Sequence, residues 1–245
     1  MIMGWLIPPP KRPTKTKEDF LKERIEKVEW LVKQGFLKSE RIKKAMLKVP
    51  REEFVPEEYR DYAYYGTTFD LEVPLPIPGE EATISCPHSF PLFYEPLELK
   101  ENEEFLEVGA GSGYGAALAR EIVGSKGKVV SIEVDEVTFK FATENLGKLG
   151  YNDILLILGD GSLGYEKEAP YDKIAVTAAC PEIPRPLIEQ LKPGGKLIAP
   201  VILSYFEDQD LILLEKQSDG TLKTKPMGKV LYVPLKREHG FKKLK

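Results

Sequence analysis

The sequence predicts an α/β fold of the Rossmann-like type, in which helices cover a mostly parallel sheet. Apolar runs of strand length lie at 105–108, 128–132 and 154–158. Segments with helical spacing separate these runs, and a glycine-rich turn or an acidic residue follows each of them. Strands that alternate with helices form parallel sheets, and ligands bind where the carboxyl ends of such strands meet. One edge of the predicted sheet is therefore the candidate ligand site.

The turn after the first run carries three alternating glycines, Gly109, Gly111 and Gly113. Glycine suits this turn because a Cβ would block both the turn and a ligand that approaches the backbone. The dinucleotide fingerprint G-x-G-x-x-G fails from Gly109, because its third glycine falls on Tyr114. From Gly111 it is formally allowed, with Ala116 in third place, but that frame begins beyond the predicted strand. A dinucleotide is therefore the less favoured ligand.

Counted from Gly109, the pattern E-x-G-x-G-x-G resembles the first motif of S-adenosylmethionine-dependent methyltransferases. In that family an acid after the second strand holds the ribose, and an Asp after the third strand lies near the adenine. The resemblance implies these roles for Glu133 and Asp160, with Ala110 and Gly161 beside them as cofactor-binding residues. A carboxylate can accept hydrogen bonds from both ribose hydroxyls. An ordinary βαβ turn with solvated acids is the alternative.

The bulk properties predict a cytoplasmic protein built as one domain. At 245 residues the chain can form one well-buried α/β domain with an appendage. The net charge of −4 and the pI of about 5.5 predict neither nucleic acid nor a membrane as partner. No apolar stretch approaches the roughly 20 residues that span a bilayer, and the N-terminal residues lack the order of a signal peptide. We expect a monomer without a metal site, with Cys86 and Cys180 as small buried hydrophobic residues rather than a reactive pair.

The chain divides into an N-terminal arm and one domain. Residues 1–16 are rich in proline and lysine and predict a flexible arm. Residues 17–245 form the domain, in which 17–100 make a helical cap and the substrate-side segment. Residues 101–245 make the cofactor-binding α/β core, which ends in a C-terminal hairpin. We therefore expect a parallel sheet with an antiparallel edge and an N-terminal helical extension.

Periodicity and turn residues predict the remaining elements. In the cap, apolar residues at helical spacing predict helices over 17–34 and 39–49. The S-D-G-T sequence at 218–221 is a hairpin signal that joins two strands. The other elements expected in the core are, in chain order, a strand at 173–177, a helix at 185–191, and strands at 196–199, 210–217 and 228–234.

A second motif lies before the first strand of the core. Residues 81–88 read E-A-T-I-S-C-P-H, which resembles the protein-L-isoaspartate O-methyltransferase signature, close to Q-[AT]-T-I-S-A-P-H. Further matches follow in the family's order at 158–162, 169–172, 188–197 and 230–235. The resemblance implies methyl transfer from S-adenosylmethionine to the free carboxylate of L-isoaspartyl residues in damaged proteins or peptides, a repair reaction.

The chemistry of this reaction limits which residues to expect. A carboxylate acceptor is already ionised at neutral pH, so no general base is needed. The site must instead align the acceptor, and hydroxyl groups such as those of Thr83 and Ser85 can orient a carboxylate without protonating it. The resemblance implies a central role for Ser85, and a cofactor site lined by Ala82, Thr83, Ile84 and Ser85. We take Ser85, Thr83 and His88 as the candidate catalytic residues, although His88 could simply shape the turn into a helix.

Four positions depart from the family pattern. Glu81 replaces Gln and adds negative charge beside a site for a carboxylate, and Cys86 replaces Ala. Pro91, with Pro96, predicts a delayed or kinked helix after the motif. Ile202 stands where the family has Gly. These differences favour two alternatives: a methyltransferase of the same fold with another acceptor, or a cofactor-binding protein without turnover.

Overall fold

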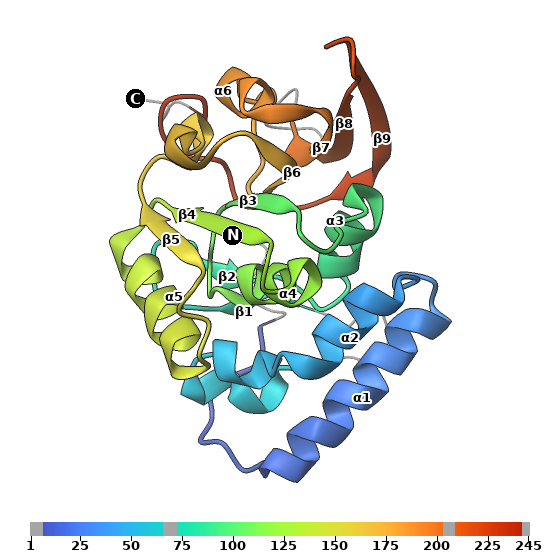
Figure 1. Ribbon diagram of the computed structural model, residues 1–245. Helices are drawn as coiled ribbons and strands as arrows, with labels where there is room; N and C mark the ends of the chain where they lie inside the picture. Colours follow the sequence, from blue (N-terminus) through green and yellow to red (C-terminus); the bar gives the residue numbers. More distant parts are fainter. Residues whose placement is uncertain (1–6, 66–72, 203–208, 242–245) are drawn as a thin grey trace.

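The computed structural model describes residues 7–65, 73–202 and 209–241, and its centre is one sheet of seven strands (Figure 1). The strand order is β5-β4-β3-β6-β7-β8-β9. The strands from β5 to β7 are parallel, whereas β8 and β9 are antiparallel to their neighbours. The predicted fold with an antiparallel edge is therefore confirmed. The strands are β3 (Glu104–Val108), β4 (Lys128–Glu133), β5 (Leu155–Leu158), β6 (Tyr171–Val176), β7 (Leu191–Val201), β8 (Gln209–Lys216) and β9 (Leu222–Val230).

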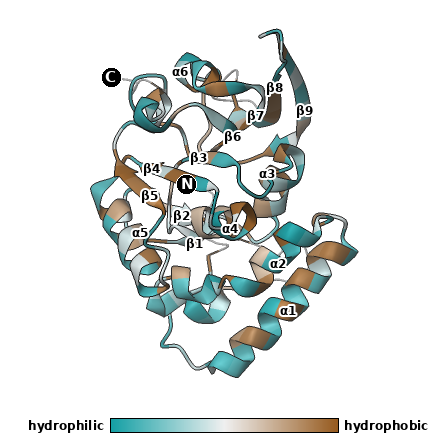
Figure 2. Cartoon of the chain, in the orientation of Figure 1, coloured by the Kyte–Doolittle hydropathy of each residue, from teal (hydrophilic) through white to brown (hydrophobic). Residues whose placement is uncertain are grey.

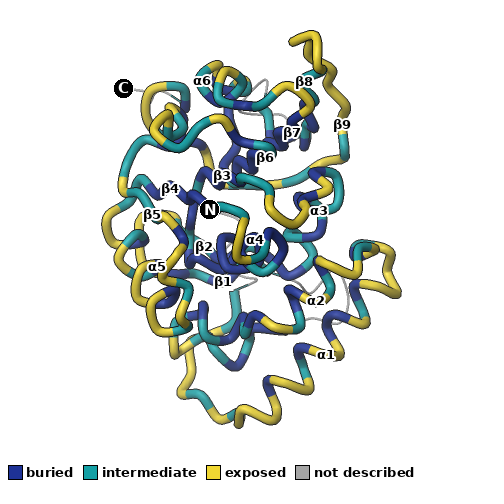
Figure 3. Tube along the Cα trace, in the orientation of Figure 1, coloured by how far each residue is buried: buried dark blue, intermediate teal, exposed yellow. Residues whose placement is uncertain are grey.

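Helices cover both faces of the sheet, and each face has its own apolar core. Successive strand residues point to opposite faces, so Phe105 packs with α3 and α4 whereas Leu106 packs with α6. Figure 3 shows the central strands and α4 largely in the dark blue of buried residues. No helix within the described ranges is both long and apolar enough to cross a membrane. The core helices are α3 (Ser89–Leu97), α4 (Tyr114–Val123), α5 (Glu136–Lys148) and α6 (Arg185–Glu189).

The N-terminal cap contains the two helices that the sequence predicts. In α1, Thr16 and Asp19 form a capping box, in which each side chain accepts the backbone N–H of the other. A residue of α3 binds the backbone at the start of α2: the Glu95 carboxylate accepts the N–H groups of Lys38 and Ser39, both at 2.7 Å. Figure 2 shows α1 alternating between brown and teal, as an amphipathic helix does. The cap consists of α1 (Lys17–Lys33), α2 (Glu40–Lys48), η2 (Arg51–Phe54) and η3 (Glu57–Tyr62).

The edge strand β9 lies earlier in the chain than the sequence predicts. It begins directly after the hairpin turn, at Leu222, and pairs with β8 up to Val230. The prediction of a strand at 228–234 is wrong because β9 is a polar edge without apolar alternation, and the apolar residues 231–235 leave the sheet. The exposed residues of β9 include Lys223, Lys225, Pro226 and Lys229.

Helix α3 begins at Ser89 in spite of its two prolines. Pro91 is the third residue of the helix, and backbone N–H groups in the first turn have no partner within a helix. Pro96 falls in the last turn. The predicted delay of this helix is therefore wrong, and α3 begins four residues after Ser85 of the T-I-S segment.

The second half of the predicted arm lies against η3. The buried Asp61 carboxylate accepts the N–H of Thr14 at 3.0 Å and the Thr14 hydroxyl at 2.8 Å, and it pairs with Lys11 at 3.0 Å. Burial opposes ionisation of Asp61, but the hydrogen bonds from Lys11 and Thr14 outweigh it and lower its pKa to about 2. These bonds attach residues 11–14 to the cap, whereas residues 1–6 lie outside the described part of the chain. The division at residue 16 stays a prediction.

Candidate active site

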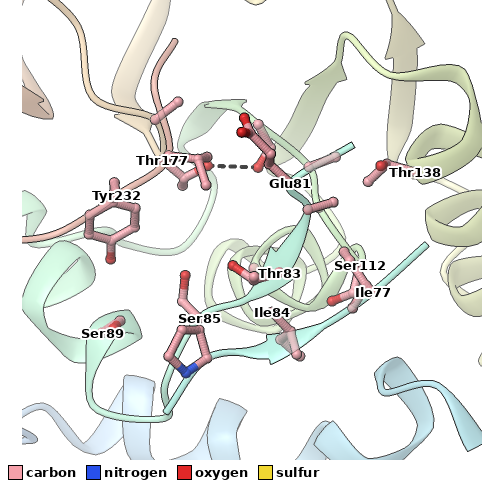
Figure 4. Close-up of a pocket in the computed structure, with 18 of the residues that line it drawn as sticks. Ile77, Glu81, Thr83, Ile84, Ser85, Ser89, Ser112, Thr138, Thr177 and Tyr232 are labelled. Atoms are coloured by element: carbon pink, nitrogen blue, oxygen red, sulfur yellow. Dashed lines mark hydrogen bonds between the residues drawn. The ribbon is translucent and has the colours of Figure 1, made fainter. Parts of the chain in front are cut away.

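A cavity of about 1030 Å³ opens at the carboxyl edge of β3, β4 and β6 (Figure 4). It is enclosed by the sheet edge, by a short hairpin in which β1 (Leu75–Pro76) pairs with β2 (Thr83–Ile84), and by residues 229–236 at and beyond the end of β9. This volume suits a nucleotide-type cofactor together with part of a second substrate. The predicted residues that line it are Ala82, Thr83, Ile84, Ser85, His88, Gly109, Ala110, Gly111, Glu133 and Gly161.

The glycine turn forms one wall of the cavity. Gly109 and Gly111 have positive φ angles of 98° and 54°, which other residues rarely adopt. A Cβ on Gly109 would collide with the Thr177 hydroxyl, which donates to the Gly109 carbonyl at 2.8 Å. Gly113 does not line the cavity: it is the N-cap of α4, with φ of 85°, and faces Leu146. The turn therefore presents bare backbone to a ligand.

Glu133 connects this turn to the end of β4. Its carboxylate accepts the N–H of Gly111 at 3.0 Å through one oxygen. The other oxygen accepts the N–H groups of Val134 at 2.8 Å and Asp135 at 3.1 Å. Glu133 is only 8% exposed, so these bonds hold the carboxylate in one place on the cavity wall. The oxygen that accepts the Gly111 N–H has a further lone pair that can accept a hydroxyl, whereas the other oxygen already accepts two N–H groups.

Asp160, like Gly113, is a predicted cofactor residue that the structure places away from the cavity. One oxygen of its carboxylate accepts the N–H and the hydroxyl of Ser162, at 3.0 and 2.7 Å. The other oxygen accepts the N–H of Glu238 at 3.1 Å. Asp160 does not line the cavity, but its neighbour Gly161 does. The carboxylate of Asp160 thus holds the C-terminal segment, and the contact to an adenine stays a prediction.

A buried arginine from the cap supports the segment that carries Ser85. Arg51 is 1% exposed, and its guanidinium donates to the carbonyls of Ser85 at 2.8 Å and Ala63 at 2.7 Å. The guanidinium also lies over the rings of Phe90 and Tyr114, 5.9 and 5.5 Å from their centroids. Planar stacking and two fixed donors make this contact directional. The cap therefore sets the position of the Ser85 backbone.

His88 lies at the N-terminal end of α3. It is the N-cap residue of that helix, is half-buried, and lines the cavity. Its ring packs at 5.4 Å from the ring of Phe36. This packing gives His88 a structural role. A catalytic role for His88 stays a prediction.

Only two of the four departures touch the cavity. Glu81 is exposed at the rim and has a positive φ of 59°, and Cys86 is buried in the wall. Pro91 and Ile202 do not line the cavity. Cys86 and Cys180 are both buried and are not joined in a disulfide, which confirms the prediction of small buried residues, and burial raises the pKa of Cys180 to about 12.

A buried carboxyl group lies behind the glycine turn. Glu107 on β3 is 3% exposed and accepts the hydroxyl of Ser131 at 2.6 Å. Burial raises the pKa of Glu107 to about 8, and the nearby charge of Glu133 adds to the rise, although the bonds from Ser131 and the Ala116 N–H oppose it. Gly115 in α4 leaves room for this carboxyl, because a Cβ there would collide with it. At neutral pH the carboxyl group of Glu107 is therefore largely protonated.

Glu107→Gln is expected to flatten the dependence of stability on pH. In the folded protein Glu107 keeps its proton up to about pH 8, whereas in the unfolded chain it loses it near pH 4.5. Its stabilising effect is complete below pH 4.5 and is lost as pH rises through 8, because the unfolded state then binds fewer protons. The loss amounts to roughly 2–4 kcal/mol, which glutamine avoids. Denaturant unfolding at pH 5, 6.5 and 8 without ligand measures the difference, with exposed Glu101→Gln as the control. Parallel curves for wild type and Glu107→Gln would contradict a protonated Glu107.

Sequence reasoning misses several residues that line the cavity. Thr177 follows β6, so the rule that ligands meet the carboxyl ends of strands could have found it. Ser89 and Tyr232 also line the cavity, but no spacing or composition singles them out. Tyr232 lies in the apolar run 230–235, which is read as a strand by its composition.

Comparisons with known proteins show to which family the chain belongs. The family model of protein-L-isoaspartate(D-aspartate) O-methyltransferase matches residues 22–240. Protein-L-isoaspartate O-methyltransferase 2 of Archaeoglobus fulgidus is 48% identical over 223 residues, which cover 91% of this chain and 97% of that protein. The protein-L-isoaspartate O-methyltransferase of Pyrococcus horikoshii is 48% identical over 215 residues, which cover 88% of this chain and 93% of that protein.

Solved structures share the fold. One protein-L-isoaspartate O-methyltransferase superposes with a TM-score of 0.77 at 34% identity, over 86% of this chain and 65% of that chain. A Plasmodium falciparum protein assigned to the same enzyme class, solved in complex with S-adenosyl-L-homocysteine, has a TM-score of 0.75 at 24% identity, over 88% of this chain and 99% of that chain. With a family model and relatives that match most of its length, the chain belongs to the protein-L-isoaspartate(D-aspartate) O-methyltransferase family.

Proposed function

We propose that the protein transfers the methyl group of S-adenosylmethionine to the free carboxylate of L-isoaspartyl residues in damaged proteins and peptides. The observation that carries this proposal is that the glycine turn, Glu133 and the hydroxyl-bearing segment Thr83 to Ser85 line the same cavity. Membership of the family supports the same reaction. The methyl ester formed can cyclise to a succinimide, which is the first step of repair.

The residues at the sheet edge fit S-adenosylmethionine. Gly109 and Gly111 leave their backbone open to the cavity, and the fixed carboxylate of Glu133 suits a ribose hydroxyl. Gly161 has no Cβ beside the end of β3, where one would lie 2.6 Å from Val108 Cγ1. When bound, S-adenosylmethionine supplies a methyl group on a sulfonium, which an ionised oxygen can displace.

The acceptor carboxylate must be aligned with the methyl group, but it needs no base to remove a proton. An isoaspartyl carboxylate is ionised at neutral pH. Its oxygen forms the new C–O bond as the C–S bond breaks, the electron pair stays on sulfur, and no proton moves. We assign Ser85 the main contact with this carboxylate, with Thr83 beside it and His88 at the entry of α3. Correct alignment of two bound reactants lowers the barrier by several kcal/mol.

A second candidate is a methyltransferase of the same fold with another acceptor. Glu81 favours it, because this residue puts a negative charge on the cavity rim where the family carries a neutral Gln. The side chain is exposed, however, and solvent screens its charge from the interior. We therefore favour the isoaspartyl acceptor.

Paired peptides test the proposed function. One peptide carries isoaspartate and the other carries normal aspartate at the same position, and both are incubated with labelled S-adenosylmethionine. We expect base-labile methyl ester on the isoaspartyl peptide alone. Cofactor binding is measured separately by calorimetry. Cofactor binding without transfer to the isoaspartyl peptide would contradict the acceptor, and a search among other acceptors would follow.

The proposal also covers the location, the oligomeric state and the partners of the protein. We infer a cytoplasmic monomer that has isoaspartyl proteins as partners and binds neither nucleic acid nor membranes. The net charge of −4 supports this, because an acidic protein is repelled by polyanions on average. Sedimentation at micromolar concentration tests the monomer, and a mass of twice 27.7 kDa would contradict it.

A further inference from the structure

Three hydroxyl groups meet on one side of the cavity, and only one of them belongs to the predicted site. They are the hydroxyls of Ser85, Ser89 and Tyr232 (Figure 4). Both serine side chains lie on the side of the Tyr232 ring that carries its phenolic oxygen. Ser85 follows β2, Ser89 is the first residue of α3, and Tyr232 follows β9. The fold therefore brings Tyr232 to a segment, 85–89, that lies far from it in the sequence.

Contacts of its backbone and of its ring hold Tyr232 in place. The side-chain amide of Gln209, which is buried, donates to the Tyr232 carbonyl at 2.8 Å and accepts the Tyr232 N–H at 2.6 Å. These two bonds replace the sheet pairing that ends at Val230. The ring of Tyr232 packs on that of Phe93, with 5.3 Å between the centroids. Backbone and ring are thus fixed, and the hydroxyl points towards the two serines.

A small cavity of about 30 Å³ lies beside the three hydroxyls. This space holds about one water molecule, or one oxygen of a carboxylate. Among its lining residues that the structure describes there is no lysine, arginine or histidine, and Glu107 is largely protonated at neutral pH. The hydroxyls therefore offer neutral donors in a place without a fixed negative charge. The lining residues are Ser85, Ser89, Phe90, Phe93, Tyr94, Glu107, Ala175, Thr177 and Tyr232.

We propose that Tyr232 and Ser89 join Ser85 in binding the carboxylate of the methyl acceptor, and that they select a carboxylate over an uncharged group. This inference rests on the proposed function. The acceptor carboxylate lies between the three hydroxyls, so that all three donate to it. Burial raises the pKa of Tyr232 to about 12, so the phenol stays a donor at every physiological pH. Neutral donors orient the oxygen without the tight ion pair that a lysine or arginine would form.

The test compares two labelled peptides in the presence of S-adenosylhomocysteine, which prevents turnover. One peptide carries isoaspartate, and the other carries isoasparagine, in which a carboxamide replaces the free carboxylate. Tyr232→Phe keeps the ring that packs on Phe93 and removes only the hydroxyl. Ser89→Ala is the second variant. Tyr62→Phe is the matched control, because the Tyr62 hydroxyl donates to Pro9 outside the cavity.

Binding of the isoaspartyl peptide is expected to weaken roughly 10- to 100-fold in Tyr232→Phe and in Ser89→Ala, since each loses a hydrogen bond to a charged group. Binding of the isoasparagine peptide should change less than about threefold, and Tyr62→Phe should leave both unchanged. Equal losses with both peptides would indicate a structural role and overturn the proposal, as would no loss. The outcomes for the wild type separate the two claims. Isoaspartyl binding without methyl transfer from S-adenosylmethionine contradicts the proposed function alone, whereas binding of neither peptide overturns both.

Discussion

Glu133→Ala is expected to weaken the binding of S-adenosylmethionine roughly 100- to 1,000-fold. The carboxylate of Glu133 is the group that the cavity offers to a ribose, and it also accepts the N–H groups of Gly111, Val134 and Asp135. Alanine removes both functions at once, so the ribose contacts are lost and the glycine turn loses its attachment to β4. Calorimetric titration with S-adenosylmethionine measures the change.

Two further variants show which part of Glu133 matters. Glu133→Gln keeps one oxygen acceptor, and we expect a loss of roughly 10-fold. Glu136→Gln changes an exposed acid of the next helix that pairs with Lys140, one turn further along, and it should bind the cofactor like the wild type. Wild-type affinity in Glu133→Ala would contradict the placement of the ribose at the end of β4.

Arg51→Met is expected to lower the free energy of unfolding by roughly 3 kcal/mol, because the buried carbonyls of Ser85 and Ala63 lose their donor. Methionine fills much of the same space, so the loss reflects hydrogen bonds rather than a large void. The second effect concerns the site. With its carbonyl released, Ser85 can shift, and a shift of about 1 Å can reduce kcat/KM for the isoaspartyl peptide roughly 100-fold.

Urea unfolding and peptide methylation measure the two effects of Arg51→Met separately. Arg185→Met is the matched control, because Arg185 is exposed on α6 and pairs with Glu189 one turn away. Arg51→Lys should recover only part of the stability, since an ammonium group lacks the planar fork that reaches two carbonyls. Full activity in the folded fraction of Arg51→Met would contradict a positioning role and leave Arg51 with a structural one.

The core of the fold is predictable because its signals are local. Strands β3 and β4 are covered on both faces, so they appear as apolar runs, and the glycines after β3 are required by backbone angles that few other residues adopt. Glu133 is predictable for a similar reason: its place at the end of β4 follows from the alternation of strands and helices. The T-I-S segment is recognisable only by its resemblance to a family, because serine and threonine occur in many turns.

The elements that could not be predicted depend on tertiary contacts. Strand β9 is held by pairing with β8, and its own residues carry no apolar pattern. Pro91 is tolerated because of its place in the first turn of α3, which spacing alone does not reveal. Asp160 binds the N–H of Glu238, a residue 78 positions later, and Tyr232 is positioned by Gln209. Contacts over such distances leave no mark in the composition of either segment.

The lysines of β9 affect the tendency of this protein to aggregate at high concentration. β9 ends the seven-stranded sheet, and an open strand is a template on which a second chain can add. A strand that approached here would bring its own side chains against Lys223, Lys225 and Lys229, and would find no N–H on Pro226. Each of these features opposes edge-to-edge association. This edge thus protects the sheet against growth into aggregates, at the side of the molecule where the chain passes on to the catalytic cavity.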